Sequence, residues 1–427
     1  MDNVDYKAVR RAALALSLRS DEERVAMLLA VADALDARRQ EIEKANALDI
    51  DQARRQGMGE ALIHRLALPS SKLDGAIAGV RAVAAQKSPV GLVRQRRLLD
   101  EGLVLEQVTY PIGVIGMIFE ARPDALIQIV SLAIKSANGL ILKGGREAQR
   151  TNACLVDIIR SCLDGAPFIA LISSHEDVDV MLRMEGEVDL IIPRGSASFV
   201  RHVMDNTHIP VLGHADGICS VYIHSQANLD EAVAIAVDSK VQYPAACNAA
   251  ETILVDRAIA PRFIPAFQKA LREYGVIIHA DGEAMENLEK GKDVVPATEA
   301  DFDTEYLALA LALKVVGNLD EALEHIAAHS SHHTDAIVTE DAEAKARFFR
   351  EVDSADVFCN CSTRFADGYR FGLGAEVGIS TSKIHARGPV GLGGLVTTKW
   401  QLSGSGQLVA SYSGPGARSF IHRELEP

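Results

Sequence analysis

The spacing of hydrophobic and polar positions changes near residue 90, and the change divides the chain into two kinds of structure. Before that point, over residues 5–85, apolar residues recur at helical spacing, as in residues 22–37. We therefore predict that residues 5–85 are helices. At residues 98–105, two short apolar segments flank a polar turn, which predicts a β-hairpin. A hairpin that projects from the rest of the chain is a candidate subunit contact.

From residue 113 onward, short apolar runs alternate with longer amphipathic segments, as strands alternate with helices. The first predicted strands are residues 114–119, 140–142, 168–172, 188–192 and 218–223. The helices predicted between them are residues 124–137, 147–163, 176–184 and 196–205, the first of which ends at Asn138-Gly139. This alternation predicts a parallel sheet covered by helices on both faces. A second series of the same kind follows over residues 229–360, with an irregular acidic part at 281–305.

Composition and charge exclude several classes of protein. The chain has 427 residues and a formal net charge of −14, which argues against a nucleic-acid reader. No stretch reaches the roughly 20 apolar residues that a membrane helix needs. The acidic start, Met1-Asp2-Asn3, lacks a signal-peptide pattern, so we expect a cytoplasmic protein. The 6 cysteines include no C-x-x-C pair, which predicts reduced thiols.

Two turns that follow predicted strands are candidates for binding a nucleotide. One is the Lys-Gly-Gly-Arg turn at 143–146, and the other is the Pro-Arg-Gly-Ser turn at 193–196, which begins a helix. Open α/β sheets bind ligands at the carboxyl ends of strands, and a helix start favours phosphate. Neither a P-loop nor a G-x-G-x-x-G motif is present, and ordinary turns with solvated cations fit the same residues.

Cys247 is the cysteine that we single out as a candidate nucleophile. It lies in a loop of small residues, 242–250, between a predicted helix and a predicted strand. A thiolate at that place would be a nucleophile if neighbouring N–H groups or cations stabilised it. From the residues alone, a small buried side chain is the more common role of a free cysteine.

Histidines and cations near the C-terminus give weaker indications of a site. His325 and His329 are spaced i, i+4 on a predicted helix, but no further residues complete a ligand set, so we predict no metal. The segment 380–389 groups cations and hydroxyls with glycine and could bind an anionic substrate. A solvated loop fits the same residues.

Together, these motifs resemble the gamma-glutamyl phosphate reductases of the aldehyde dehydrogenase superfamily, along nearly the whole chain. The resemblance is carried by YPIGVIGMIFEARPD at 110–124, the Lys143-Gly144-Gly145 turn, CNAAET at 247–252 and FGLGAEVGISTSKIHARGP at 371–389. It implies NADPH-dependent reduction of L-glutamyl 5-phosphate to glutamate 5-semialdehyde and phosphate, the second step of proline synthesis from glutamate. The Cys247 thiolate would attack the acyl phosphate, and the resulting thioester would be reduced.

The resemblance also implies roles for further residues. The cofactor would be bound by Lys143, Gly145, Arg146, Gly195, Ser196 and Glu305, with Glu305 at the nicotinamide ribose. Arg146 stands near the position where relatives that use NAD place an acidic residue, which favours the 2′-phosphate of NADPH. The substrate would be bound by Arg122, Asn248, Lys383 and Arg387.

The chain departs from the superfamily pattern at two places. His214 falls where hydrolytic relatives carry a glutamate base, and Ala121-Arg122-Pro123 replaces their oxyanion asparagine. The missing base fits an enzyme whose thioester is reduced, and the oxyanion would then rely on the backbone N–H of Cys247 and a second donor. Two alternatives remain open: an aldehyde dehydrogenase that uses no phosphate or acylates coenzyme A, and a non-catalytic oligomeric scaffold.

The predicted fold is α/β and aldehyde dehydrogenase-like, with two doubly wound α/β domains, a small oligomerisation hairpin and a tail. The expected borders are 1–225 for a cofactor-binding domain, with the hairpin at about 95–110, and 226–365 for a catalytic domain. Residues 366–427 are expected to return to the cofactor domain and end in an oligomerisation tail. We expect a homo-oligomer that acts on a small molecule and contacts a glutamate kinase at most transiently, without nucleic-acid or membrane partners.

Overall fold

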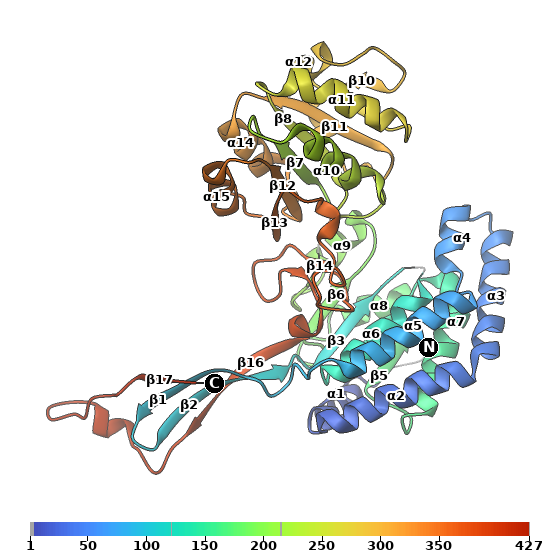
Figure 1. Cartoon of the computed structure of the whole chain (residues 1–427). Coiled ribbons are helices and arrows are strands. Elements are labelled where there is room, and N and C mark those ends of the chain that lie inside the picture. The colour runs from blue at the N-terminus through green and yellow to red at the C-terminus, as the bar shows by residue number, and fades with distance from the viewer. Residues whose placement is uncertain (1–3, 121, 214–215, 427) are drawn as a thin grey trace.

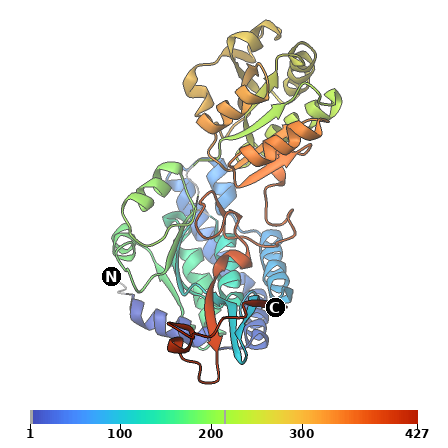
Figure 2. The same cartoon turned by 90° about the vertical axis from the view of Figure 1, so that its left-hand side faces the viewer.

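The computed structural model describes residues 4–120, 122–213 and 216–426. These residues form two α/β units and a long arm, which projects from the first unit at the lower left of Figure 1. Seen at right angles in Figure 2, the second unit stands above the first, and the C-terminal segment runs between them. The predicted α/β fold class is confirmed in this architecture.

The predicted N-terminal helices pack against the first unit. They are α1 (Tyr6–Ser17), α2 (Asp21–Ala37), α3 (Arg39–Arg55), α4 (Glu60–Leu66) and α5 (Ser70–Ala85). Helix α2 begins with a capping box, in which Ser20 and Glu23 each bond the other's backbone N–H. Its apolar face, including Leu28 and Val31, is buried in one core with α5 and α6.

The first unit contains a parallel sheet in the order β5-β4-β3-β6. Its strands are β3 (Val114–Ile118), β4 (Gly139–Lys143), β5 (Ile169–Ile172) and β6 (Leu190–Pro193), and its helices are α6 (Pro123–Lys135), α7 (Gln149–Ser161), α8 (His175–Met181) and α9 (Ala197–Asp205), with the 3₁₀ turn η1 (Arg146–Ala148). Strands β3 and β4 are buried throughout, which explains their continuous apolar runs. The strand order reverses between β3 and β6, so ligands are expected at the carboxyl ends of these strands.

The second unit contains a sheet in the order β10-β9-β11-β8-β7-β12-β13, in which every pairing is parallel. Its strands are β7 (Cys219–Ile223), β8 (Ala250–Asp256), β9 (Ile277–Ala280), β10 (Val294–Pro296), β11 (Ala310–Val316), β12 (Thr334–Val338) and β13 (Asp356–Cys359). Its helices are α10 (Leu229–Val241), α11 (Ala260–Arg272), α12 (Gly282–Glu286), α13 (Glu299–Phe302), α14 (Leu319–His329) and α15 (Ala342–Glu351). The stretch expected to be irregular, 281–305, thus contains α12, β10 and α13.

The border between the two units differs from the one expected at residue 225. Strand β7 pairs with β8 and β12, so it belongs to the second sheet and not to the first. A strand that is buried on both faces has the same continuous apolar pattern in either sheet. Its pairing, which depends on residues far along the chain, decides the sheet to which it belongs.

The arm is an antiparallel sheet in the order β16-β2-β1-β17. Its strands are β1 (Val93–Asp100), β2 (Leu103–Pro111), β16 (Val396–Ser403) and β17 (Arg423–Leu425), and η4 (Val409–Tyr412) lies between the last two. The predicted hairpin is therefore the centre of a larger sheet that the C-terminal segment completes.

The C-terminal segment returns to the first unit before it enters the arm. It begins with η2 (Thr363–Phe365), which still contacts α10 and β12 of the second unit, and continues with β14 (Ile379–Ser380), β15 (Gly388–Pro389) and η3 (Leu392–Leu395). Val377, Val390 and Leu395 are buried in the core of the first unit. In the part of the chain that the structure describes, no helix has the length and apolar character to cross a membrane.

Candidate active site

Cys247 lies at the amino end of β8, in the loop between α10 and β8. Glu305 precedes β11 and Gly217 precedes β7, and these two strands are the neighbours of β8 in the sheet. Because the strands are parallel, their amino ends share one edge of the sheet. Three segments far apart in the sequence therefore meet beside the cysteine.

Gly217 shows how closely these segments approach one another. A β-carbon built on Gly217 would lie 2.6 Å from Cα of Cys247 and 2.6 Å from Oε1 of Glu305, and still closer to the carbonyl oxygen of Cys247. The thiol of Cys219 donates to that same carbonyl oxygen at 3.3 Å. The predicted catalytic residue and the predicted nicotinamide-ribose residue are thus brought together, with a glycine between them.

Asn248 orders the chain directly after the cysteine. Its side chain is buried, and Nδ2 donates to the carbonyl oxygen of Ala366 at 2.7 Å. The amide oxygen Oδ1 is also buried and has no hydrogen-bond partner among the residues that the structure describes. A buried acceptor without a partner costs stability, and a substrate donor could satisfy it.

Arg194, which follows β6, is an arginine whose pKa is influenced by the charge of Cys247. The position of a β-carbon on Gly378 lies 3.6 Å from Nε of Arg194, so the side chain packs on the backbone of the C-terminal segment. Burial lowers the pKa of Arg194, and the charge of Arg122 lowers it further, whereas Glu376 and Cys247 oppose this shift.

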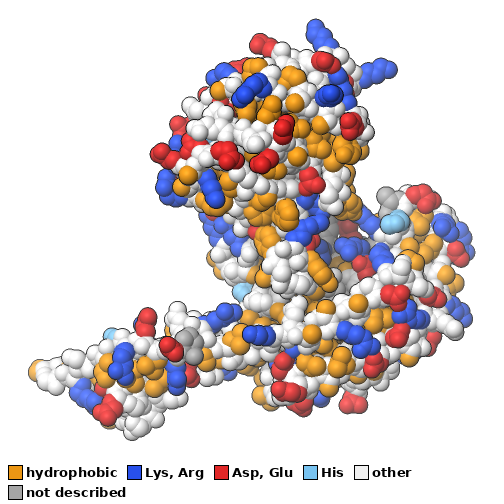
Figure 3. Space-filling view, viewed as in Figure 1, with side chains coloured by type: hydrophobic (Ala, Val, Ile, Leu, Met, Phe, Trp, Pro, Cys, Tyr) orange, Lys and Arg blue, Asp and Glu red, His pale blue; other side chains and the backbone are white. Residues whose placement is uncertain are grey.

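Arg364, in η2, approaches the thiol from the second unit. Its Nε donates to Oε1 of Gln242 at 2.8 Å, and its guanidinium lies 5.8 Å from the ring centroid of Tyr243. Burial lowers the pKa of Arg364, which the charge of Cys247 opposes. Figure 3 shows Lys and Arg side chains gathered at the recess between the two units. The two arginines place positive charge near the thiol, which favours an anionic substrate.

The other predicted substrate cations already have acidic partners. Lys383 and Arg387 both form ion pairs with Asp353, and the distance from Nη1 of Arg387 to Oδ1 of Asp353 is 3.1 Å. Arg122 pairs with Asp124 at 3.0 Å and is exposed. The structure therefore brings Arg122 close to Arg194, while Asp353 compensates the charges of Lys383 and Arg387.

The predicted cofactor residues other than Glu305 lie at or near the carboxyl edge of the first sheet. Lys143 ends β4 and is buried, and burial lowers its pKa. Ser196 caps α9 by accepting the backbone N–H of Phe199 at 3.4 Å. A β-carbon on Gly195 would lie 2.9 Å from Oε1 of Glu120, at the end of β3. The absence of a side chain at Gly195, beside a capped helix start and a lysine, fits the phosphates of a dinucleotide.

The remaining cofactor residues flank this edge. Gly145 precedes η1, and a β-carbon there would overlap the carboxylate of Glu147, so only glycine fits without displacing it. Arg146 begins η1 and is exposed. His214, the residue at the position of the hydrolytic base, and Ala121, in the segment that replaces the oxyanion asparagine, lie outside the described residues.

The histidine pair considered as a metal site lies within the second unit. The rings of His325 and His329 are 4.4 Å apart, and Nδ1 of His329 lies 2.8 Å from Oδ1 of Asp303. Burial lowers the pKa of His325 to about 3. Within residues 4–120, 122–213 and 216–426, no group of three or more His, Cys, Asp or Glu could bind a metal ion.

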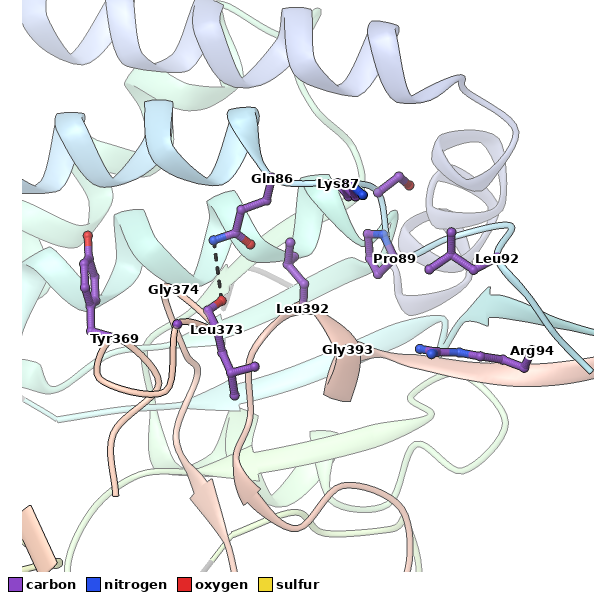
Figure 4. Close-up of a pocket in the computed structure, with 12 residues that line it drawn as sticks. Gln86, Lys87, Pro89, Leu92, Arg94, Tyr369, Leu373, Gly374, Leu392 and Gly393 are labelled. Atoms are coloured by element: carbon purple, nitrogen blue, oxygen red, sulfur yellow. Dashed lines mark hydrogen bonds between the residues drawn. The ribbon is translucent and has the colours of Figure 1, made fainter. Parts of the chain in front are cut away.

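A pocket of about 500 Å³ lies away from these residues, where the arm joins the first unit (Figure 4). It is lined by Gln86 and Lys87, which follow α5, by Arg94 of β1, and by Leu373 and Leu392 of the C-terminal segment. Nε2 of Gln86 donates to the carbonyl oxygen of Leu373 at 3.5 Å, which joins the end of α5 to the C-terminal segment. None of the predicted site residues lines this pocket.

Sequence reasoning did not assign roles to Arg194, Arg364 or Gly217. Arg194 lies within the predicted phosphate-binding turn at 193–196. That turn was the one sequence signal that could have marked Arg194 as a site residue. The position of Arg364 near Cys247 depends on how the C-terminal segment folds back between the units, which no local pattern reveals. Gly217 allows the close approach of Cys247 and Glu305, which lie 30 and 88 residues away from it in the sequence.

Comparison with known proteins identifies the family to which the chain belongs. The sequence model of the Aldehyde dehydrogenase family matches residues 3–285. A gamma-glutamyl phosphate reductase from Acaryochloris marina is 52% identical over 420 residues, which cover 97% of this chain and 96% of the relative. A crystal structure of a gamma-glutamyl phosphate reductase from Thermotoga maritima superposes with a TM-score of 0.92 at 39% identity, covering 94% of this chain and 98% of that one.

A more distant structure shares the fold alone. It is an acetylating aldehyde dehydrogenase from Geobacillus thermoglucosidasius, with a TM-score of 0.65 at 18% identity, covering 94% of this chain and 96% of that chain. The resemblance found in the sequence is therefore confirmed, and the family implies an enzyme that uses a nicotinamide cofactor. This chain belongs to the gamma-glutamyl phosphate reductases, within the aldehyde dehydrogenase family.

Proposed function

We propose that this chain reduces L-glutamyl 5-phosphate to L-glutamate 5-semialdehyde and phosphate with NADPH, the second step of proline biosynthesis. The observation that carries the proposal is the meeting of Cys247, Glu305 and Gly217 at one edge of the second sheet. Relatives that are 52% identical over 97% of this chain are named gamma-glutamyl phosphate reductases.

Cys247 is proposed as the nucleophile. Its thiolate attacks the carbonyl carbon of the acyl phosphate, the C–O bond to phosphate breaks, and phosphate leaves to give a thioester. The nicotinamide cofactor, when bound, supplies a hydride to the thioester carbonyl. The C–S bond of the resulting alkoxide then breaks, which releases the aldehyde and restores the thiolate. No water has to be activated, in keeping with the missing hydrolytic base.

The substrate is a small polyanion, and positive side chains are proposed to bind it. Arg122, Lys383 and Arg387 remain candidates, although Asp353 would have to share the last two. The backbone N–H of Cys247 is proposed as one oxyanion donor. The unpaired amide oxygen of Asn248 could accept from the α-ammonium group of the substrate.

NADPH is proposed as the cofactor because cations flank the edge at which it would bind. The residues proposed to bind it are Lys143, Gly145, Arg146, Gly195, Ser196 and Glu305. Arg146 is exposed and close enough to lower the pKa of Lys143, so two positive charges could meet a 2′-phosphate. We expect Arg146→Glu to raise KM for NADPH about 10-fold and to change KM for NADH little, since one charge-assisted hydrogen bond is lost.

A homo-oligomer in the cytoplasm is proposed as the working form. The arm exposes apolar side chains that a single chain leaves uncovered, among them Trp400 and Leu402. A glutamate kinase that makes the acyl phosphate is proposed as a transient partner, because such a mixed anhydride reacts with water. Nucleic-acid and membrane partners are not proposed.

The reverse reaction tests the proposed function. Purified protein would be incubated with glutamate 5-semialdehyde and NADP⁺, with and without inorganic phosphate, beside Cys247→Ala. We expect NADPH formation that requires both phosphate and Cys247. Formation without phosphate would indicate a hydrolytic dehydrogenase, and no formation under any condition would contradict the proposal.

A further inference from the structure

Lys240 and Glu251 form an ion pair that is completely buried. Nζ of Lys240 lies 2.5 Å from Oε2 of Glu251, and both side chains have 0% exposure. A buried ion pair is costly to desolvate, and apolar residues of the same volume are often at least as stabilising. The pair is therefore poorly explained by stability alone.

The positions of the two residues relate the pair to the catalytic loop. Lys240 is the second-last residue of α10, and Glu251 is the second residue of β8. The loop between these elements, residues 242–249, carries Cys247. The buried ion pair thus connects the residues at the two ends of that loop.

Tyr306 connects the same pair to the segment that carries Glu305. Its ring centroid lies 5.9 Å from Nζ of Lys240, and its hydroxyl donates to Oδ1 of Asp301 at 2.9 Å. Asp301 also pairs with His279, whose ring lies 4.9 Å from that of Tyr306. Glu305 is therefore followed directly by a residue that packs on Lys240 and is anchored at its far end.

The ion pair also interacts electrostatically with Glu305 of the site. The pKa of Glu251 is raised to about 7, mainly by burial; the charge of Glu305 acts in the same direction, and Lys240 opposes the shift. Without Lys240 the buried carboxyl would take up a proton. The second carboxylate oxygen, Oε1, is buried without a hydrogen-bond partner among the residues described.

We propose that the Lys240–Glu251 pair, with Tyr306 packed on it, is a positioning device that sets the Cys247 loop and the Glu305 segment in one geometry. None of the three residues needs to touch the reacting atoms. The effect on turnover rests on the proposed function, whereas the effect on the reactivity of the thiol does not.

The experiment compares Lys240→Met, Glu251→Gln and the double variant Lys240→Met/Glu251→Leu with the parent protein. Three quantities are measured: the thermal midpoint, kcat and KM of the phosphate-dependent reverse reaction, and the rate at which iodoacetamide alkylates Cys247, read by peptide mass spectrometry. The matched control is Lys135→Met, since Lys135 is equally buried and pairs with Asp21 at 2.9 Å in the first unit.

We expect the double variant to recover the thermal midpoint that the single variants lose, because apolar residues replace the whole pair. Its kcat should stay about 100-fold below that of the parent, since small displacements at a reacting centre are costly. Its alkylation rate should also change several-fold, whereas Lys135→Met should alter only the midpoint. A double variant with parental kcat and alkylation rate would overturn the proposal.

Tyr306→Ala covers the case in which the buried variants fail to fold, because Tyr306 is only partly buried. We expect it to fold, to lower kcat and to alter alkylation of Cys247; parental values for both would overturn the proposal. If the parent shows no phosphate-dependent turnover, the proposed function fails, and the alkylation rates still decide the positioning role.

Discussion

At the scale of single residues, the site depends on a position where a side chain is excluded. A methyl group on Gly217 would collide with the backbone of Cys247 and with Glu305, and backbone atoms cannot rotate away. We expect Gly217→Ala to lower kcat at least about 100-fold, because Cys247, the proposed nucleophile, and Glu305 would be forced apart. Steady-state kinetics of the reverse reaction would measure this loss.

Gly213→Ala is the matched control for Gly217→Ala. It lies in the same segment, and its β-carbon would make only ordinary contacts with Pro193, at 3.5 Å and beyond. Its kcat should stay close to that of the parent. Equal losses in the two variants would mean that the whole segment, and not the contact with Cys247, limits activity.

Asp356 is a residue at which stability should depend on pH. Its carboxyl is buried, Oδ2 has no hydrogen-bond partner among the described residues, and burial raises the pKa to about 6. A pKa raised by folding means that the folded state favours the proton, so stability falls as pH rises from about 4 through 6. We expect Asp356→Asn to stabilise the protein at pH 7.5 by up to about 3 kcal/mol.

Urea unfolding of Asp356→Asn and of the parent, at pH 7.5 and at pH 4, would test whether the substitution stabilises the protein as predicted. The gain should disappear at pH 4, where both side chains are neutral. A gain of equal size at both pH values would show that packing, rather than the buried charge, is responsible.

At the scale of elements, one turn joins a helix, a strand and the C-terminal segment. Helix α6 ends at Lys135, and the residue with left-handed backbone is Ala137, with φ 60°, two positions before the glycine expected at the stop. Asn138 then accepts the N–H of Gly113 at 2.8 Å and donates to the carbonyl oxygen of Leu395 at 2.8 Å. Its side chain thus fastens η3 to the start of β3.

We expect Asn138→Ala to destabilise the protein by about 2–4 kcal/mol, because several buried backbone groups would lose their partners. Chemical denaturation would measure the change. Asn287→Ala is the control, since its side chain is only partly buried and makes a single local bond to Glu283. A loss below about 0.5 kcal/mol for Asn138→Ala would contradict the role given to this turn.

At the scale of the whole molecule, the arm is the part that a second copy of the chain would cover. Trp400 and Leu402, on one face of β16, are 54% and 58% exposed. We expect Trp400→Glu/Leu402→Glu to lower the mass in solution, because charges would replace the apolar contact surface. Light scattering after size exclusion would measure the mass. Leu18→Glu, at an apolar position on the first unit that is even more exposed, should leave the mass unchanged, and a monomeric parent would contradict the proposal.

The sequence by itself determined most of the helices and strands and the types of residue that are candidates for the site. Helical and alternating periodicities depend on neighbours within one or two turns, so the N-terminal helices, the arm hairpin and most strands were predictable. The family motifs likewise led to the proposed roles of Cys247 and the Lys-Gly-Gly turn, because backbone and side-chain requirements at such turns are local.

The tertiary structure alone decided which of these elements meet. Strand β7 joined the second sheet through pairing with β8 and β12, and that pairing placed Gly217 beside Cys247. The return of the C-terminal segment decided that Arg387 would pair with Asp353 and that Arg364 would lie near the thiol. Contacts of this kind follow from burying apolar surface between segments distant in sequence, and no local pattern specifies the partner.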